Sequence, residues 1–184
     1  MTTIIAATSV LQGCAVNHAA TLDALEAALS SKPSATAVLT DWCAQRGFAQ
    51  APAIVARRIA GSAALTEPEA LRSSLAVPAN ETLGYRHVEL VCGTQVLSVA
   101  HNWYVPARLS PEMNATLEGS DTPFGKIVGP LGFSRELLSS LRGEGPGCPP
   151  GTILTQRAVL CLPDGLPLSY LIECYTTANL AAAS

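Results

Sequence analysis

The chain has 184 residues, of which 48% are apolar and only 14% are charged. A typical soluble domain carries about 25% charged residues, so either the surface is sparsely charged or an unusually large part of the chain is buried. The formal net charge is −3 and the longest basic run is Arg57-Arg58, which argues against a surface that tracks nucleic-acid phosphates. No stretch approaches the ~20 apolar residues of a membrane-spanning helix. We therefore expect one domain over residues 1–184 with a substantial core.

The N-terminal segment, residues 1–20, is either disordered or signal-like. It opens with a largely apolar, uncharged stretch, and Leu11-Gln12-Gly13-Cys14 resembles a lipoprotein cleavage box. An export signal normally begins with Lys or Arg, whereas the first basic residue here is Lys32. We therefore expect a cytoplasmic protein, with export as a lipoprotein through Cys14 as the alternative.

The cysteines are widely spaced and include no C-x-x-C pair: Cys14, Cys43, Cys92, Cys148, Cys161 and Cys174. This spacing excludes the common zinc-ribbon patterns and a thioredoxin-type motif. We expect buried free thiols that pack as small apolar side chains, and the even count leaves disulfides open as the alternative.

Helical patterns come first along the chain. Residues 21–29 carry leucines at i, i+3 and i+7, with Thr21 as a plausible N-cap. A second helix is predicted to begin near Ser34 and to end at Gly47, so that the two form an α-hairpin. A short β-branched run follows at 52–58. After it comes a polar connection with a helical turn at 67–74.

Strand patterns dominate from Tyr85 onward. Residues 85–92 and 95–105 are strand-like, and Gly93-Thr94 between them suits a tight hairpin turn. A second hairpin turns at Pro163-Asp164-Gly165, between strands at 153–162 and 166–176. Because helices come first and antiparallel hairpins later, the pattern predicts an α+β fold.

Two short helices and a loop are predicted between the two hairpins. Ser110-Pro111 and Thr122-Pro123 each place a capping residue before a proline, which predicts two short helices. Residues 143–151 are rich in Gly and Pro and are predicted to form a loop.

Arg86 is conspicuous because it lies within an apolar strand. Strand alternation places it on the same face as Val88, Leu90 and Cys92. Such an arginine either extends to solvent from the strand end or points its guanidinium at a buried carboxylate, for which its geometry is well suited.

Glu173 raises the same question in Leu171-Ile172-Glu173-Cys174-Tyr175, where its neighbours are apolar on both sides. A buried carboxylate is costly unless it is paired or protonated. One interpretation is an internal salt bridge, for instance with Arg157 or Arg86. The other is a carboxyl group that serves a substrate hydroxyl or a proton transfer.

The histidines offer a weaker candidate, a metal site. His87 and Glu89 share a strand face, and His101 lies on the next strand. With a two-residue turn at Gly93-Thr94, His101 opposes Arg86 on the face away from His87, which argues against a metal trio. We predict no metal site. The sequence also lacks the context of a nucleophile elbow, a cysteine protease or a phosphate loop.

Several short motifs, taken in order, resemble chorismate lyase: Tyr85-Arg86-His87-Val88-Glu89-Leu90, Tyr104-Val105-Pro106, Thr122-Pro123-Phe124-Gly125 and Gly165-Leu166-Pro167-Leu168, followed by Glu173. The resemblance covers about residues 83–176. It implies an antiparallel sheet of about six strands, with helices packed on it and a closed internal ligand cavity beneath helical flaps. The family cleaves chorismate to 4-hydroxybenzoate and pyruvate and requires no metal or organic cofactor.

The resemblance also implies roles for individual residues. The substrate-binding arginine of the family falls on Arg86 and its active-site glutamate on Glu173, which makes these the expected catalytic residues. The backbone of Phe124 would contact the ligand carboxylate, and Arg157 matches an arginine in the strand before Glu173. A flap methionine that contacts the ligand in the family falls on Ala35, so that wall of the cavity differs here.

Two hypotheses about the function of the chain follow. The first is a monomeric lyase acting on chorismate, or on a different chorismate-like substrate, without a nucleic-acid partner. The second is a non-catalytic protein of the same fold, exported or not, that binds a small aromatic or cyclohexadiene carboxylate. The fold also serves as the sensor domain of GntR-type regulators, but the residues before Tyr85 lack a basic recognition helix.

Overall fold

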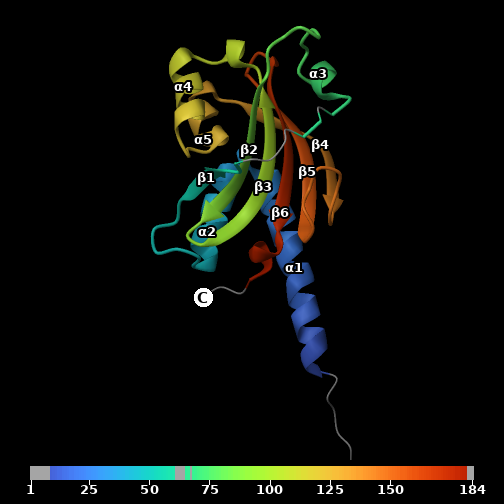
Figure 1. Cartoon of the computed structure of the whole chain (residues 1–184). Helices are drawn as coiled ribbons and strands as arrows, with labels where there is room; N and C mark the ends of the chain where they lie inside the picture. The colour runs from blue at the N-terminus through green and yellow to red at the C-terminus, as the bar shows by residue number, and fades with distance from the viewer. Residues whose placement is uncertain (1–8, 61–64, 67, 182–184) are drawn as a thin grey trace, which may run out of the picture.

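The computed structural model describes residues 9–60, 65, 66 and 68–181, with side chains from residue 18 onward. Six strands form one sheet in the order β1-β2-β3-β6-β5-β4, and every neighbouring pair is antiparallel (Figure 1). The strands are β1 (Ile54–Arg58), β2 (Gly84–Cys92), β3 (Gln95–Tyr104), β4 (Ser134–Arg142), β5 (Thr152–Cys161) and β6 (Pro167–Thr176). The expected α+β architecture with a six-stranded antiparallel sheet is confirmed.

Helices pack on the sheet, and several of them lie in the segments that connect its strands. They are α1 (Ser9–Ser31), α2 (Ala35–Arg46), α3 (Leu71–Ser74), α4 (Pro111–Gly119) and α5 (Phe124–Val128), with short 3-10 turns at Pro106–Arg108, Gly129–Leu131 and Thr177–Leu180. α4 and α5 lie together at one end of the sheet, whereas α1 extends from the other end (Figure 1).

The boundaries of α2 follow from local chemistry. The Ser34 side chain accepts a hydrogen bond from the backbone amide of Ala37, which caps the helix at its start. Gly47 ends the helix in the left-handed conformation (φ 66°). Both ends agree with the prediction. α1, in contrast, begins twelve residues before Thr21, at Ser9.

This longer helix includes the backbone of the Leu11–Cys14 box. The side chain of Cys14 and residues 1–8 lie outside the described part of the chain, so export through Cys14 stays the untested alternative. Within that part, no helix is long and apolar enough to cross a membrane.

Three apolar clusters hold the layers together. α1 and α2 bury Leu25, Leu39 and Trp42 against one half of a sheet face. On the other half of that face, Leu117 of α4 and Phe124 of α5 pack on Leu168 and Leu171 of β6. α3 contributes to the cluster on the opposite face, where it meets Trp103, Tyr170 and Ile172. The first face is therefore covered by two separate groups of helices, α1 with α2 and α4 with α5. We call these groups the two covers; they adjoin over the middle of the sheet.

Four of the cysteines are paired, as Cys43–Cys92 and Cys148–Cys174. The expectation of free thiols is therefore wrong for these four, and the disulfide alternative holds. The first bond joins α2 to β2, and the second joins the 143–151 loop to β6. Cys161 is half-buried and free. Both bonds fix covering segments to the sheet.

A β-bulge between Leu90 and Val91 changes the register of β2 and β3, so that His87 lies opposite His101. Their rings stack with centroids 4.1 Å apart. The expectation that His101 opposes Arg86 is therefore wrong, because Arg86 pairs with Asn102. Across the described ranges, no three His, Cys, Asp or Glu side chains are grouped as metal ligands.

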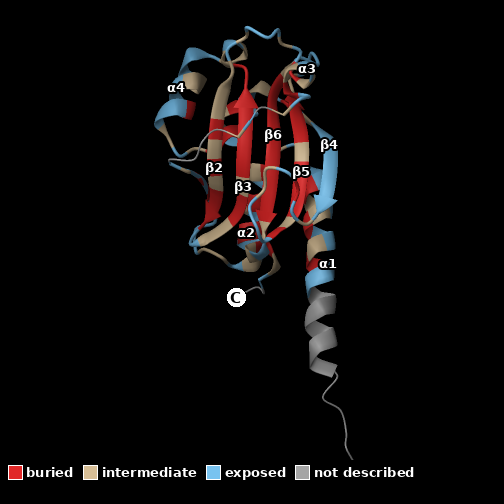
Figure 2. Cartoon of the chain, turned by 45° about the vertical axis from the view of Figure 1, so that its right-hand side comes forward, coloured by how far each residue is buried: buried red, intermediate tan, exposed pale blue. Residues whose placement is uncertain are grey.

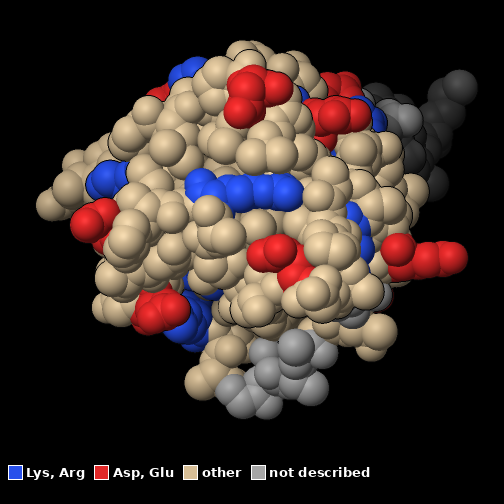
Figure 3. All heavy atoms as spheres, turned by 90° about the horizontal axis from the view of Figure 1, so that it is seen from above, with Lys and Arg blue, Asp and Glu red and all other residues tan. Residues whose placement is uncertain are grey.

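The outer strand β4 is the most exposed part of the sheet, in contrast to the buried strands β3 and β6 (Figure 2). Leu137, Leu138 and Leu141 are exposed on it. Charges are scattered over the face seen in Figure 3, where neutral surface separates the basic side chains. That face carries no continuous basic patch.

Candidate functional site

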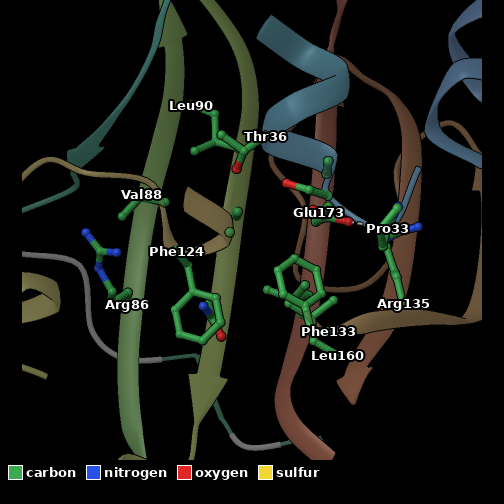
Figure 4. Close-up of a pocket in the computed structure, with 16 residues that line it drawn as sticks. Pro33, Thr36, Arg86, Val88, Leu90, Phe124, Phe133, Arg135, Leu160 and Glu173 are labelled. Carbon is green, nitrogen blue, oxygen red and sulfur yellow. Dashed lines mark hydrogen bonds and ion pairs between the residues drawn. The ribbon is translucent and has the colours of Figure 1, made fainter. Parts of the chain in front are cut away.

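A cavity of about 50 Å³ lies on the helix-covered face of the sheet, between the starts of α2 and α5 (Figure 4). Its floor comes from β2, β3, β4, β5 and β6, and its sides come from the starts of α2 and α5 and from the segments that precede α2 and β4. The lining residues are Pro33, Ser34, Ala35, Thr36, Arg86, Val88, Leu90, Ala100, Asn102, Phe124, Gly125, Phe133, Arg135, Leu160, Leu171 and Glu173. Most of the lining is apolar, and only three of these side chains carry a charge.

Arg86 projects from β2 and is only 5% exposed, so it does not extend to solvent. Its guanidinium donates hydrogen bonds to the carbonyl oxygens of Thr122 (3.2 Å) and Ser120 (3.3 Å), whereas its Nε has no partner in the described structure. Burial, followed by the charge of Arg58, lowers the pKa of Arg86. No carboxylate pairs with it among the described residues. Arg86 is thus a buried cation whose hydrogen-bond partners among the described residues are neutral carbonyls.

Glu173 lies in the middle of β6 and is 4% exposed. Its carboxylate forms an ion pair with Arg135 of β4, and Arg135 also donates to the Gln156 side chain at 3.0 Å. Burial alone would lower the pKa of Arg135, but the charge of Glu173, the influence of Tyr175 and the hydrogen bond to Glu173 together outweigh burial and raise this pKa. The expected internal salt bridge exists, but the proposed partners Arg157 and Arg86 are wrong.

Tyr175, two residues further along β6, shares this buried surrounding. Its side chain is fully buried. Burial, together with the charge of Glu173, raises its pKa well above the usual value. The phenol therefore remains neutral and leaves the Arg135–Glu173 pair as the charged group at this end of the cavity.

The structure brings four of the five residues singled out in the sequence to one cavity. Phe124 and Ala35 are the first residues of α5 and α2, and both line the cavity together with Arg86 and Glu173. Arg157 does not line it. It lies one position beyond Gln156 on β5, on the other face of the sheet, and donates to the carbonyl of Pro146 at 3.0 Å.

Arg135 is the charged lining residue that the sequence reasoning missed. It stands between Phe133 and Leu137 at alternate positions, which is the pattern that made Arg86 conspicuous in β2. A search for a charged residue that alternates with apolar ones would therefore have identified Arg135 in residues 133–137.

The cavity is small in this structure. An apolar protein cavity of about 150 Å³ holds one benzene molecule, and the present volume is about 50 Å³. A ring-sized ligand therefore requires the two covers to separate. They meet where Gly125 approaches Ser34, because a Cβ on Gly125 would lie 2.9 Å from the Ser34 Oγ.

Two surface grooves adjoin the cavity. One, of about 520 Å³, shares Ser34, Thr36 and Gly125 with the cavity. The other, of about 480 Å³, shares Pro33, Phe133 and Arg135 with it. Arg135 therefore lines both the charged end of the cavity and the second surface groove.

Comparisons with known proteins identify a close relative and a shared fold. No protein-family model matches the chain. The uncharacterized protein y4mC from Sinorhizobium fredii is 39% identical over 180 residues, which covers 88% of this chain and 76% of that protein.

Among solved structures, the effector domain of PhnF from Mycobacterium smegmatis matches with a TM-score of 0.51 at 14% identity, covering 78% of this chain and 88% of that one. The possible transcriptional regulator YydK from Bacillus subtilis has a TM-score of 0.48 at 16% identity, and the match covers 71% of this chain and 62% of that one. The match to the PhnF effector domain shows a common fold, and it does not identify a ligand.

Proposed function

The chain belongs to the family of the uncharacterized protein y4mC, and we propose that it binds a small aromatic or cyclohexadiene carboxylate in the cavity beneath α2 and α5. The observation that carries this proposal is Arg86, a guanidinium that is 5% exposed and has no carboxylate partner among the described residues. The shared fold with an effector domain agrees with a role in ligand binding.

An unpaired buried cation is costly because the protein interior replaces water poorly as a solvent for charge. A carboxylate ligand would remove that cost, and it would form charge-assisted hydrogen bonds with the guanidinium. The Nε of Arg86 supplies a donor that no described residue of the protein uses. The backbone amide of Phe124, at the start of α5, is the expected second contact for the same carboxylate.

The opposite end of the cavity favours a hydroxyl. Glu173 is paired with Arg135, yet a carboxylate has several acceptor positions and one arginine does not use all of them. Where Ala35 lines the cavity, its small side chain leaves more room than a larger one would. An aromatic acid with a hydroxyl across the ring from its carboxylate fits both ends.

Chorismate cleavage is the second candidate function, because Arg86 and Glu173 line the same cavity. In that reaction Arg86 would hold the ring carboxylate and Glu173 the C4 hydroxyl, while the enolpyruvyl group leaves as pyruvate and the ring becomes aromatic. Positioning and the exclusion of water would supply most of the rate. This chemistry calls on neither a metal nor an organic cofactor.

One experiment separates the two functions. Purified protein is mixed with chorismate, and the absorbance of 4-hydroxybenzoate is followed together with the release of pyruvate; in parallel, 4-hydroxybenzoate is titrated into the protein in a calorimeter. Saturable binding without turnover supports a binding protein. Equal amounts of both products support the lyase. If the protein neither binds nor turns over these compounds, the proposed function is wrong.

A further inference from the structure

We propose that Arg135 and Glu173 together limit the cavity to ligands with a single negative charge, so that dicarboxylates are rejected and a neutral polar group is required at the end away from Arg86. This inference rests on the proposed carboxylate-binding function and adds the charge class of the ligand. Because chorismate carries two carboxylates, the inference also favours a binding protein over the chorismate lyase. Its first support is the charge of the lining: two arginines and one glutamate leave a single excess positive charge.

None of the three charges is screened by solvent. Arg86 is 5% exposed, and the side chains of Arg135 and Glu173 are 6% and 5% exposed. Interactions between charges are strong in such surroundings because little water lies between them. One carboxylate beside Arg86 makes the net charge of the cavity zero, whereas a second carboxylate makes it negative.

The place that a second ligand carboxylate would occupy explains why dicarboxylates in particular would bind weakly. A ligand that spans the cavity from Arg86 reaches the pair of Arg135 and Glu173 at the other end (Figure 4). The guanidinium of Arg135 is already engaged by Glu173 and Gln156. A ligand carboxylate there would meet the like charge of Glu173 without a free cation to offset it, and buried like charges repel strongly.

A neutral hydroxyl fits the same place. Glu173 accepts hydrogen bonds, and the Nε of Arg135 is a buried donor without a partner in the described structure. A hydroxyl both donates and accepts, so one group on the ligand could satisfy both. Arg135 would therefore act as a specificity residue, since it holds Glu173 as an acceptor and supplies a donor beside it.

The test compares three aromatic acids of similar shape: benzoate, 4-hydroxybenzoate and terephthalate, which carries a carboxylate in place of the hydroxyl. Dissociation constants are measured by calorimetry near neutral pH. We expect the wild-type protein to bind 4-hydroxybenzoate at least about tenfold more tightly than terephthalate. Equal or tighter binding of terephthalate would overturn the inference while leaving carboxylate binding intact. Failure of all three acids to bind would instead refute the proposed function itself.

Glu173→Gln tests the origin of the selectivity. It keeps the shape of the side chain and removes its charge, so the lining gains a second excess positive charge. We expect the preference for 4-hydroxybenzoate over terephthalate to shrink by about tenfold or to invert. Arg142→Ala is the control, because Arg142 lies on β4 like Arg135 but forms its ion pairs at the surface, with Asp23 and Glu26. An unchanged ratio in a folded Glu173→Gln protein, checked by its thermal melting, contradicts the assigned role.

Discussion

Arg135 of β4 and Glu173 of β6 form a buried ion pair that reaches across the intervening strand β5. Gln156 of β5 accepts a further hydrogen bond from Arg135 at 3.0 Å. Three strands are thus joined by polar side chains on the face that carries the cavity. The pair fixes the exposed edge strand to the centre of the sheet and determines the charge at one end of the cavity.

Breaking this pair should destabilise the fold. Arg135→Ala leaves Glu173 buried without its cationic partner, and we expect the free energy of unfolding to fall by about 3–5 kcal/mol. Replacing both residues by leucine removes both buried charges and should restore most of the loss. Urea unfolding followed by circular dichroism measures each value. A loss no larger than that of Arg142→Ala, whose side chain is 53% exposed, would contradict the role of the buried pair.

The contact between the two covers should appear as coupling between Gly125 and Ser34. A Cβ at residue 125 would displace the Ser34 hydroxyl, which caps α2 by accepting from the Ala37 amide. Gly125→Ala should therefore destabilise the protein by about 1 kcal/mol, the usual worth of an N-cap. In a Ser34→Ala background the cap is already absent, so Gly125→Ala should cost nothing or stabilise α5 slightly. Additive effects in this double-mutant cycle would show that the covers do not touch there.

Acid should weaken the fold through His101. Its Nδ1 lies 2.7 Å from the Tyr85 hydroxyl and its Nε2 lies 3.0 Å from the Gly147 carbonyl. Burial, and then the nearby His87, lower the pKa of His101 to about 4. Between that value and the ordinary value of about 6.5, the unfolded chain binds a proton that the folded chain does not, so stability falls as the pH falls through this window.

The size of that loss is roughly 3 kcal/mol, and it can be measured by urea unfolding at a series of pH values. His101→Gln keeps a donor and an acceptor but does not titrate, so its stability should depend much less on pH in this window. His18→Gln is the control, because His18 is exposed on α1. Parallel pH profiles for the wild type and His101→Gln would show that another group is responsible.

Thiol labelling should distinguish Cys161 from the paired cysteines. Burial, with the charge of Glu136, raises the pKa of the Cys161 thiol, so it should react slowly with iodoacetamide near neutral pH. Cys43, Cys92, Cys148 and Cys174 should react only after reduction, and mass spectrometry of peptides gives the pairs directly. Reducing the Cys43–Cys92 bond, which closes a separation of 49 residues, should cost about 2–4 kcal/mol. Labelling of these four without reductant would contradict both bonds.

Local signals in the sequence predicted much of the fold. Ser34 and Gly47 delimit α2 because an N-cap hydroxyl and a left-handed glycine act within one turn of the helix. Both hairpins were predicted because alternation and turn residues are also local. Arg86 and Glu173 were recognisable for the same reason: each interrupts an apolar strand with a charge that must be accommodated.

Features that depend on distant pairing could not be predicted in this way. The bulge at Leu90/Val91 reversed the expected placement of His101. A second irregularity between Leu137 and Ser139 breaks the alternation of β4 after its first four residues, so this strand was missed although Arg135 lies in its regular part. Without β4, the true partner of Glu173 was missed as well. The disulfides join residues 49 and 26 positions apart, and cysteine spacing alone does not determine such pairs.

The central claim is that the buried Arg86 exists to bind a carboxylate, and calorimetric titration of 4-hydroxybenzoate into the wild type and Arg86→Met tests it most directly. Methionine keeps the apolar stem and removes the charge, and thermal melting verifies that the variant is folded. The account predicts saturable binding of one ligand per wild-type chain and a loss of affinity of about 100-fold in Arg86→Met. Equal affinity of the two proteins would contradict it.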